Sequence, residues 1–255
     1  MGPADDLLSR LRGDLHAHTT WSDGRASLAE MAAAAEDLGR EYLAVTDHSP
    51  RLRVANGLSR ERLRAQWDEI ERVQAERDVR ILRGIEVDIL GDGSLDQADD
   101  LLSRLDVVVA SVHSDLNGPA EVLTARMVGA VSNPHTTVLG HCTGRRRRED
   151  GTWRAPSRFD AEVVFAACEM FGVAVEINSR LDRADPPPEL LLLANEIGCL
   201  FAVDSDAHTT GQLSALRHGV ARAAEAGIGP DRIITTWPVE DLLRHAARRR
   251  DRAVD

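Results

Sequence analysis

Residues 13–24 read G-D-L-H-A-H-T-T-W-S-D-G and contain three candidate metal ligands. His16 and His18 are two residues apart, so on an extended strand their side chains point to the same side. Asp23 follows five residues later in a Ser-Asp-Gly turn. Imidazole is a common metal ligand, and carboxylates complete sites of mixed nitrogen and oxygen ligands. Two ordinary polar residues at a strand end give the same pattern, so a metal site needs partners elsewhere in the chain.

Strand and helix patterns alternate along the rest of the sequence. Apolar runs predict strands at residues 12–16, 42–46, 79–89, 106–112, 137–140, 173–177 and 199–203. Helical patterns lie between and after them, at about 27–39, 59–78, 97–104, 119–131, 160–172, 189–198, 212–227 and 239–250. Run 106–112 is rich in valine and nearly continuously apolar, as a strand buried on both faces should be. The alternation predicts an α/β fold, most simply a distorted seven-stranded TIM-like barrel. We expect one domain over residues 1–255, with the barrel and terminal helices at about 12–250.

Metal-ligating side chains recur where the predicted strands end. They are His16 and His18, His48, Glu86, His113, His141, and Asp206 with His208. Parallel barrels carry their active sites at the C-terminal ends of the strands, so these side chains should meet at one rim. Any one of these histidines can be a satisfied polar residue. The whole set indicates a metal centre at the C-terminal ends of the strands.

The composition excludes several classes of protein. A net charge of −11 argues against nonspecific binding of nucleic acid by the whole protein surface. No apolar run approaches the ~20 residues that a membrane-spanning helix needs. The chain has no lysine, which excludes a Schiff-base lysine, a P-loop lysine and a carboxylated-lysine metal bridge. The three cysteines are far apart, and residues 1–12 lack the apolar core of a signal peptide. We therefore expect a cytoplasmic protein.

Arginines follow three of the predicted strands on the same side as the ligands. They are Arg51 and Arg53, then residues 145–148, then Arg180 and Arg183. Guanidinium groups bind phosphate in a bidentate manner, although runs such as 146–148 often only face solvent. We expect Arg145 first, with Arg51, Arg53 and Arg180, to hold phosphate oxygens. Trp21 and Trp153 lie in the same loops, where a base could stack, although packing against the loop is the plainer interpretation. Asp47 is expected either to orient His48 or to cap the following turn.

The motifs H-A-H with S-D-G, T-D-H-S, G-I-E, S-V-H, L-G-H and S-D-A-H occur in this order. Together they resemble the PHP (polymerase and histidinol phosphatase) family over about residues 12–250. The stretches L-R-V-A-N-G-L-S, G-I-E-V-D-I-L-G-D-G-S-L-D and V-V-V-A-S-V-H-S are similar to the C-terminal PHP domain of bacterial and archaeal family X DNA polymerases. Cys142 stands where proline is usual, and Asn-Ser-Arg replaces Asn-Ala/Gly-Asn after the sixth strand. Neither departure touches a ligand.

The resemblance implies a trinuclear site with two to three divalent transition metals such as Zn, Mn or Fe. One metal would bind His16, His18, Glu86 and Asp206. A second metal would share Glu86 and bind His113 and His141. A third metal would bind Asp23, His48 and His208. The residues expected to carry the catalysis are Asp23, His48, Glu86, Asp206 and His208.

This chemistry favours hydrolysis of a phosphate ester by a metal-bound hydroxide. The polymerase-associated motifs imply a 3′–5′ exonuclease or 3′-end-processing phosphodiesterase on DNA, with a DNA polymerase or repair partner and no membrane. One alternative is a small-metabolite phosphomonoesterase of histidinol-phosphatase type. An amidohydrolase-like enzyme with Glu86 as the bridging ligand is another. The last alternative is a non-catalytic, metal-stabilised module of a repair or replication assembly, against which the complete ligand set argues.

Overall fold

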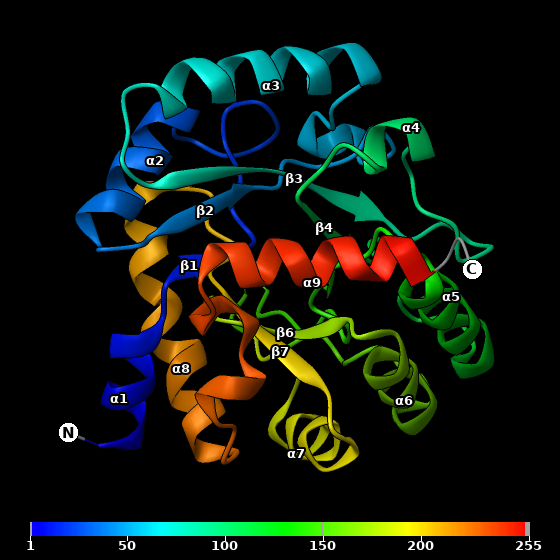
Figure 1. The fold of residues 1–255 in the computed structure, drawn as a ribbon. Helices are drawn as coiled ribbons and strands as arrows, with labels where there is room; N and C mark the ends of the chain where they lie inside the picture. Colours follow the sequence, from blue (N-terminus) through cyan, green and yellow to red (C-terminus); the bar gives the residue numbers. More distant parts are fainter. Residues whose placement is uncertain (1, 149, 253–255) are drawn as a thin grey trace.

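The computed structural model describes residues 2–148 and 150–252. Seven parallel strands are arranged in chain order around a nearly closed barrel, with helices on its outside (Figure 1). The predicted α/β barrel is therefore confirmed. The strands are β1 (Gly13–Asp14), β2 (Tyr42–Val45), β3 (Arg80–Asp88), β4 (Val107–Ser111), β5 (Val138–Leu139), β6 (Ala174–Asn178) and β7 (Leu200–Asp204).

Helices connect successive strands, and their ends follow local sequence signals. Ser27 and Ser59 accept backbone hydrogen bonds as N-caps, and Gly172 and Gly198 end their helices with positive φ. The α-helices are α1 (Pro3–Arg10), α2 (Leu28–Asp37), α3 (Arg60–Gln74), α4 (Asp99–Leu102), α5 (Ala120–Ser132), α6 (Ala161–Phe171), α7 (Pro188–Ile197), α8 (Leu216–Glu225) and α9 (Val239–Arg252). Short 3₁₀ turns are η1 (Arg53–Ala55), η2 (Thr210–Ala215), η3 (Pro230–Arg232) and η4 (Ile234–Thr236).

The barrel closes between β7 and β1 by other means than a regular strand pair. At the C-terminal end, Ala17 and Ala207 form a parallel bridge, and His18 N donates to Ala207 O at 2.8 Å. Towards the N-terminal end, η4 fills the gap, where Arg12 N donates to Thr235 O at 2.9 Å. This closure places the His-x-His segment next to the Ser-Asp-Ala-His segment, 190 residues later in the chain.

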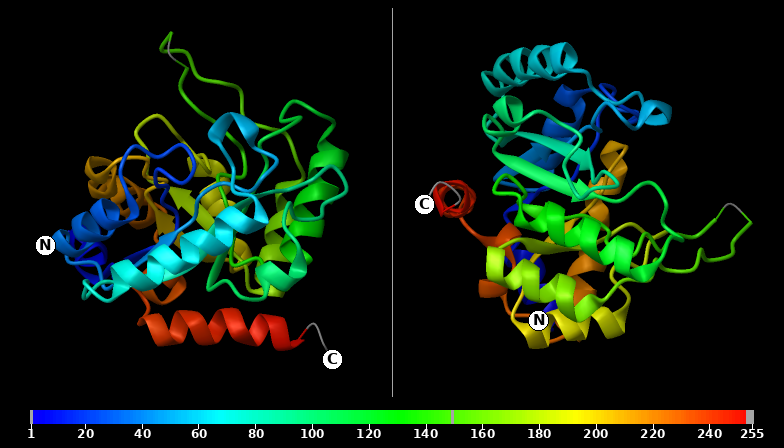
Figure 2. Two further views of the ribbon diagram at one scale, coloured as in Figure 1. Left: turned by 90° about the horizontal axis from the view of Figure 1, so that it is seen from above. Right: turned by 90° about the vertical axis from the view of Figure 1, so that its right-hand side faces the viewer.

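Apolar side chains fill the barrel interior and leave one end for polar groups. Leu15, Tyr42, Leu82 and Val109 are fully buried inside, and burying a side chain of this size contributes ~1.5–3 kcal/mol. Leu242 of α9 joins this cluster, and α9 crosses the N-terminal end of the barrel, as Figure 2 shows. The barrel is therefore closed below, and the site can open only at the C-terminal end of the strands.

Some expected elements differ from those observed. The strand expected at 12–16 pairs with β2 only over Gly13–Asp14, because Leu15 N and Ala17 N donate instead to the Asp204 and Thr46 side chains. The helix expected at 97–104 is the single turn α4, and the segment 212–227 divides into η2 and α8. Helix α1 was not expected from the sequence. Among the described residues, no helix is both long enough and apolar enough to cross a membrane.

Candidate metal centre

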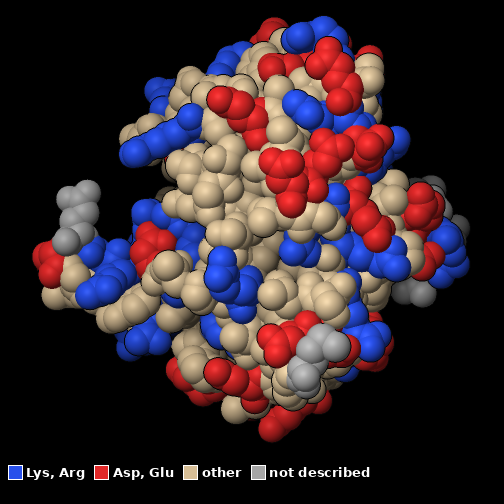
Figure 3. All heavy atoms as spheres, turned by 90° about the vertical axis from the view of Figure 1, so that its left-hand side faces the viewer, with Lys and Arg blue, Asp and Glu red and all other residues tan. Residues whose placement is uncertain are grey.

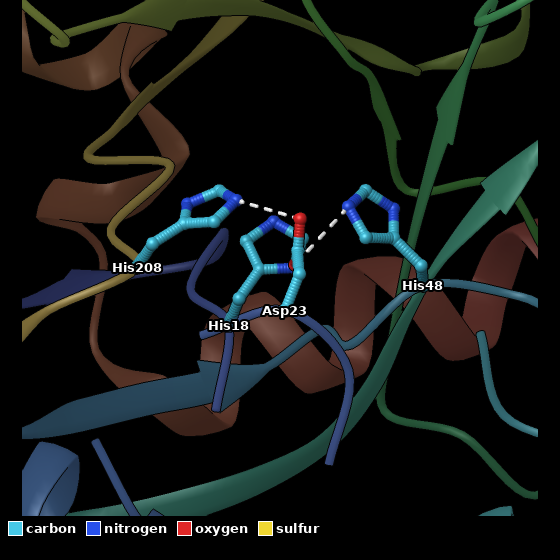
Figure 4. A group of neighbouring side chains, drawn as sticks. All are labelled: His18, Asp23, His48 and His208. Carbon is cyan, nitrogen blue, oxygen red and sulfur yellow. Dashed lines mark ion pairs between the residues drawn. The ribbon is translucent and has the colours of Figure 1, made fainter. Parts of the chain in front are cut away.

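Four predicted ligands face one another at the mouth of the barrel (Figure 4). The ring nitrogens of His18, His48 and His208 surround the Asp23 carboxylate, and one donor atom from each residue lies within 4.8 Å of the others. Asp23 Oδ2 is 3.5 Å from His208 Nε2, and Asp23 Oδ1 is 3.6 Å from His48 Nε2. The four residues follow β1, β2 and β7. This group can hold one metal ion at the solvent-facing side of the site.

Glu86 of β3 lies at the centre of the other ligands. Its side chain is 1% exposed, and both of its carboxylate oxygens face imidazole nitrogens. Oε2 is 3.4 Å from His16 Nε2, 3.6 Å from His18 Nε2 and 2.8 Å from His48 Nδ1, and Oε1 is 3.3 Å from His113 Nε2 and 2.9 Å from His141 Nε2. A carboxylate with five imidazoles around it can serve as a bridge between metals.

Asp206 completes a third group with His16 and His18. Its Oδ1 is 3.4 Å from His18 Nε2, and its backbone has a φ of +49°. Its Oδ2 accepts hydrogen bonds from Arg183 Nε at 2.9 Å and Asn178 Nδ2 at 3.1 Å. A non-glycine residue with this φ is uncommon, and here the turn aims the carboxylate at the histidines.

Buried donor atoms without hydrogen-bond partners show that these residues fit a bound cation. Among the described residues, His16 Nε2, both ring nitrogens of His18, and Glu86 Oε1 are buried and form no hydrogen bond. His48 Nδ1 is also unpartnered, because its 2.8 Å approach to Glu86 lacks hydrogen-bonding geometry. Buried polar atoms are normally paired, since an unpaired one costs ~1–3 kcal/mol. Metal coordination would satisfy the Glu86 oxygen and one nitrogen of each of these rings.

The electrostatics of the site keep His18 and Glu86 in the form that a metal requires, whereas neighbouring carboxylates outweigh burial and raise the pKa of His16, His113 and His208 in metal-free protein. Burial, and repulsion from His48 and His208, lower the pKa of His18 to about 3, so its ring is neutral at pH 7. Burial alone would raise the pKa of Glu86, but the surrounding histidines outweigh it and hold that pKa well below its usual range. Neutral imidazoles and ionised carboxylates are the metal-binding forms of these side chains.

Two carboxylates behind the ligands orient the histidine rings. Glu176 of β6 is fully buried; its Oε1 lies 2.5 Å from His16 Nδ1, and its Oε2 accepts from His141 N at 2.6 Å. Asp88 of β3 is paired with His113 Nδ1. Each of these contacts leaves Nε2 of its ring facing Glu86. Carboxylate partners of this kind fix the tautomer and raise the basicity of a ligating histidine.

The loop that carries Asp23 is held by Asp47. The Asp47 carboxylate accepts from the backbone and hydroxyl groups of Thr19 and Ser22, and from Gln66 Nε2 at 2.7 Å. Among the described residues, its hydrogen bonds go to this loop and to α3 and not to His48. Asp47 therefore positions Asp23 and not the ring of His48.

The PHP domain family matches residues 14–208 of this chain. The chain belongs to the PHP family. The resemblance stated from the motifs is thereby confirmed, and as a PHP-family phosphoesterase the chain carries several groups of side chains that could hold metals.

Individual PHP relatives differ in length. A DNA polymerase/3'-5' exonuclease PolX of Bacillus subtilis is 39% identical over 236 residues, which are 92% of this chain and 41% of that protein. The chain therefore spans less than half of PolX. A probable phosphatase of Thermoanaerobacter sp. (strain X514) is 30% identical over 251 residues, covering 92% of this chain and 96% of that protein. Histidinol phosphate phosphatase of Lactococcus lactis, solved with zinc, L-histidinol and phosphate, shares the fold with a TM-score of 0.61 and 18% identity, over 86% of this chain and 95% of that one.

The structure brings the nine predicted PHP ligands to one end of the barrel. They are His16, His18, Asp23, His48, Glu86, His113, His141, Asp206 and His208. The grouping differs in detail from the expected three sets. His18 joins Asp23, His48 and His208, while His48 joins Glu86 and His113. The side chains of His18 and His48 lie between two groups each, so either assignment is sterically open.

The predicted phosphate-binding arginines lie at different distances from the ligands. Arg180, Arg183 and Arg146 line a cavity of about 180 Å³ together with seven of the nine predicted ligands. Arg180 and Arg183 are well shielded, with side chains 12% and 11% exposed. Arg51 and Arg53 are exposed around η1, and Arg145 stacks on Trp153 at 5.2 Å from the ring centroid. None of these last three lines the cavity, so Arg180 is the member of the predicted set that faces the ligands.

Sequence reasoning missed several functional side chains, although a signal existed for most. Glu176 interrupts an apolar strand and shares its face with Asn178, two residues on. Asp88 is likewise two residues after Glu86. Arg183 was named among the arginines after the sixth strand, but its approach to Asp206 depends on the loop after β6 and has no local sequence signal.

Proposed function

We propose that this chain hydrolyses phosphodiesters at the 3′ end of a DNA strand, as a 3′–5′ exonuclease or 3′-end-processing enzyme. The observation that carries the proposal is the pair Arg180 and Arg183, which line the same cavity as the ligand cluster. Two guanidinium groups beside a prospective metal centre suit the negative charge of a phosphate ester. The similarity to PolX over 92% of this chain supports DNA as the source of that ester.

The residues of the site divide into those that hold metals and those that hold substrate. The nine predicted ligands would hold two or three divalent metals such as Zn, Mn or Fe. Bound metals of this kind lower the pKa of water and stabilise the charge on the leaving oxygen. Asp23 and His208 form the outer edge of the cluster, with side chains 36% and 21% exposed, so the ester would approach from their side.

The arginines would orient the phosphate. Arg183 Nε is 2.9 Å from Asp206 Oδ2, and Arg180 is held by Asp182 through contacts of 2.8 and 3.0 Å. Both guanidinium groups are therefore fixed before substrate arrives. This lowers the entropic cost of binding the nonbridging oxygens of the phosphate. Asp182 also accepts from Arg146 at the rim, at 2.8 Å. One carboxylate thus ties two of the three cavity arginines together.

A small-metabolite phosphomonoesterase is the second candidate. Its support is the relative named a probable phosphatase, which this chain matches over 96% of its length. A cavity of about 180 Å³ would also accommodate a small phosphate ester. Attachment to, or cooperation with, a DNA polymerase or repair partner belongs to the exonuclease proposal, because the chain covers 41% of PolX.

The test compares substrates on one metal-loaded preparation. We expect a 5′-labelled oligodeoxynucleotide to be shortened from its 3′ end and bis-p-nitrophenyl phosphate to be hydrolysed. Asp206→Asn should abolish both reactions, whereas the exposed Asp241→Asn on α9 should leave both unchanged. Turnover of L-histidinol phosphate alone would replace the exonuclease with the phosphomonoesterase. Turnover of lactones or amides without any phosphate ester would indicate an amidohydrolase-like enzyme, and the absence of all turnover would indicate a non-catalytic module.

A further inference from the structure

We propose that the segment between β5 and α6 is an arm that binds single-stranded nucleic acid outside the metal cavity. The arm comprises residues 144–148 and 150–157. This inference rests on the proposed function and deepens it, because it assigns the part of the protein that would distinguish a polynucleotide from a small ester. Figure 2 shows the arm projecting from the end of the barrel opposite α9, where the ligands also lie.

Backbone hydrogen bonds give the arm a defined shape. Arg148 N donates to Thr152 O at 2.7 Å and Arg154 N to Arg146 O at 2.8 Å, which makes the arm a hairpin. Arg147 N donates to Asp182 O at 2.7 Å, and this fastens one side of the hairpin to the loop after β6. That same loop supplies Arg180 and Arg183 to the cavity. The arm is therefore fixed relative to the metal centre.

The arm concentrates positive charge, because its sequence has five arginines (145–148 and 154) against two acidic residues, Glu149 and Asp150. Arg146, Arg147 and Arg148 are exposed, and among the described residues only Arg146 of these three forms an ion pair, with Asp182. The overall charge of the chain is −11, so an arm with a net positive charge departs from the rest of the surface. Figure 3 shows the arm as a projection with positively charged side chains along it and negatively charged ones near its tip, and the surface is hollowed between the arm and the body of the barrel.

Trp153 adds an aromatic surface to this charge. Its side chain lies directly across the hairpin from Arg147 and is 41% exposed. The Arg145 guanidinium lies over the ring at 5.2 Å from its centroid. An exposed indole backed by a guanidinium group suits stacking of a nucleobase, and alternation of arginine with an aromatic ring is typical of surfaces that bind single strands.

The segment around η1 forms another part of the cavity rim. Leu52, Val54 and Ala55, in and beside η1, line the same cavity as Arg146. Val54 is 96% exposed, and Arg51 and Arg53 flank it. A nucleic-acid strand that enters between the arm and η1 would have arginines beside its phosphates on both sides and an apolar surface beside its terminal base.

The geometry favours a polynucleotide over a small ester as the partner of the arm. Arg147, Arg148 and Trp153 do not line the cavity, so a molecule confined to about 180 Å³ would not reach them. A strand whose 3′ end lies at the ligands would continue past the arm. The arm would therefore contribute to strand binding and not to hydrolysis of a small diester.

The experiment separates binding from hydrolysis. Binding of a 5′-fluorescein oligodeoxynucleotide is measured by anisotropy with metal-free protein, so that the strand stays intact, over a series of salt concentrations. Arg147→Ala/Arg148→Ala should weaken binding about tenfold and lower the salt dependence by ~1.4, since each phosphate contact to a single strand contributes ~0.7. Trp153→Ala should weaken binding roughly fivefold to a hundredfold. The control Arg72→Ala/Arg80→Ala removes two exposed arginines far from the cavity and should change binding less than twofold.

Hydrolysis of bis-p-nitrophenyl phosphate by the metal-loaded variants then tests the two proposals independently. Wild-type rates in both arm variants would show an intact metal centre and place the effect in strand binding. If the arm variants lose strand binding while the metal-loaded protein hydrolyses no ester, the proposal for the arm stands and the proposed function is overturned. Unchanged strand binding in both arm variants, or an equal loss in the Arg72/Arg80 control, would overturn the proposal that the arm binds the strand.

Discussion

Replacing Glu176 by glutamine should weaken metal binding without removing any ligand. The buried carboxylate contacts His16 Nδ1 at 2.5 Å and accepts from His141 N at 2.6 Å, so it supports two predicted ligands at once. Glutamine has the same shape and keeps an acceptor for His16. Its amide nitrogen would then face the backbone N–H of His141 and the amide of Asn178, both of which are donors.

The expected size of the effect follows from these contacts. Loss of a carboxylate behind a ligating histidine typically reduces metal affinity ~10- to 100-fold, which is ~1.4–2.8 kcal/mol. Glu176→Gln also places two donors against each other in a fully buried position. We therefore expect a loss towards the upper end of this range for the metal that His16 would bind.

Competition with a chromophoric chelator measures this affinity directly, with Zn or Mn added to metal-free protein. The matched control is Glu189→Gln, an exposed residue of α7, which should bind metal as the wild type does. Circular dichroism of the metal-free variant establishes that it is folded. An affinity within twofold of the wild type in folded Glu176→Gln would refute the role assigned to this carboxylate.

Three further predictions concern the cavity, the ligand loop and pH. Arg183→Ala should lower kcat/KM for bis-p-nitrophenyl phosphate ~10- to 100-fold, because a charged hydrogen bond is worth ~1.5–3 kcal/mol; steady-state kinetics that match the wild type would remove Arg183 from substrate binding. Gly24→Ala would place a Cβ 2.7 Å from the His18 backbone, so urea unfolding should show ~1–3 kcal/mol of lost stability, and an unchanged midpoint would contradict this packing. In metal-free protein the charges of Glu86 and Asp88 outweigh burial and raise the pKa of His113 to about 9. The proton on His113 therefore contributes fully to folding stability below about pH 6.5, and this contribution is lost as the pH rises through 9. The free energy of unfolding should therefore fall between pH 7 and 9.5, and a rise across this interval would contradict the assignment.

The barrel could be predicted from sequence because its strands are buried on both faces. A nearly continuous apolar run such as 106–112 fits a strand buried on both faces of an α/β fold, and polar side chains, mostly histidines, mark where the strands end. The closure between β7 and β1 could not be predicted, because it depends on a single bridge at Ala17 and on η4. Those contacts join segments far apart in the chain and have no local pattern.

The candidate site shows the same division between local and distant information. Ligands at strand ends share a periodicity of two and a common rim, so their convergence follows from the fold. The arginines come from loops, whose paths are set by tertiary contacts such as Arg180 with Asp182. Arg145 was expected at the phosphate first, yet it stacks on Trp153 while Arg183 lines the cavity. Both residues follow a predicted strand, so the sequence alone did not distinguish them.

The central claim is that the ligand cluster at the mouth of the barrel is a metal-dependent phosphoesterase centre. The most direct test is to titrate metal-free protein with Zn, Mn or Fe and to measure hydrolysis of bis-p-nitrophenyl phosphate at each step. We expect no turnover without metal and a rate that rises and saturates at two to three metal ions per chain. Turnover that is independent of metal, or no turnover with any of the three metals, would contradict it.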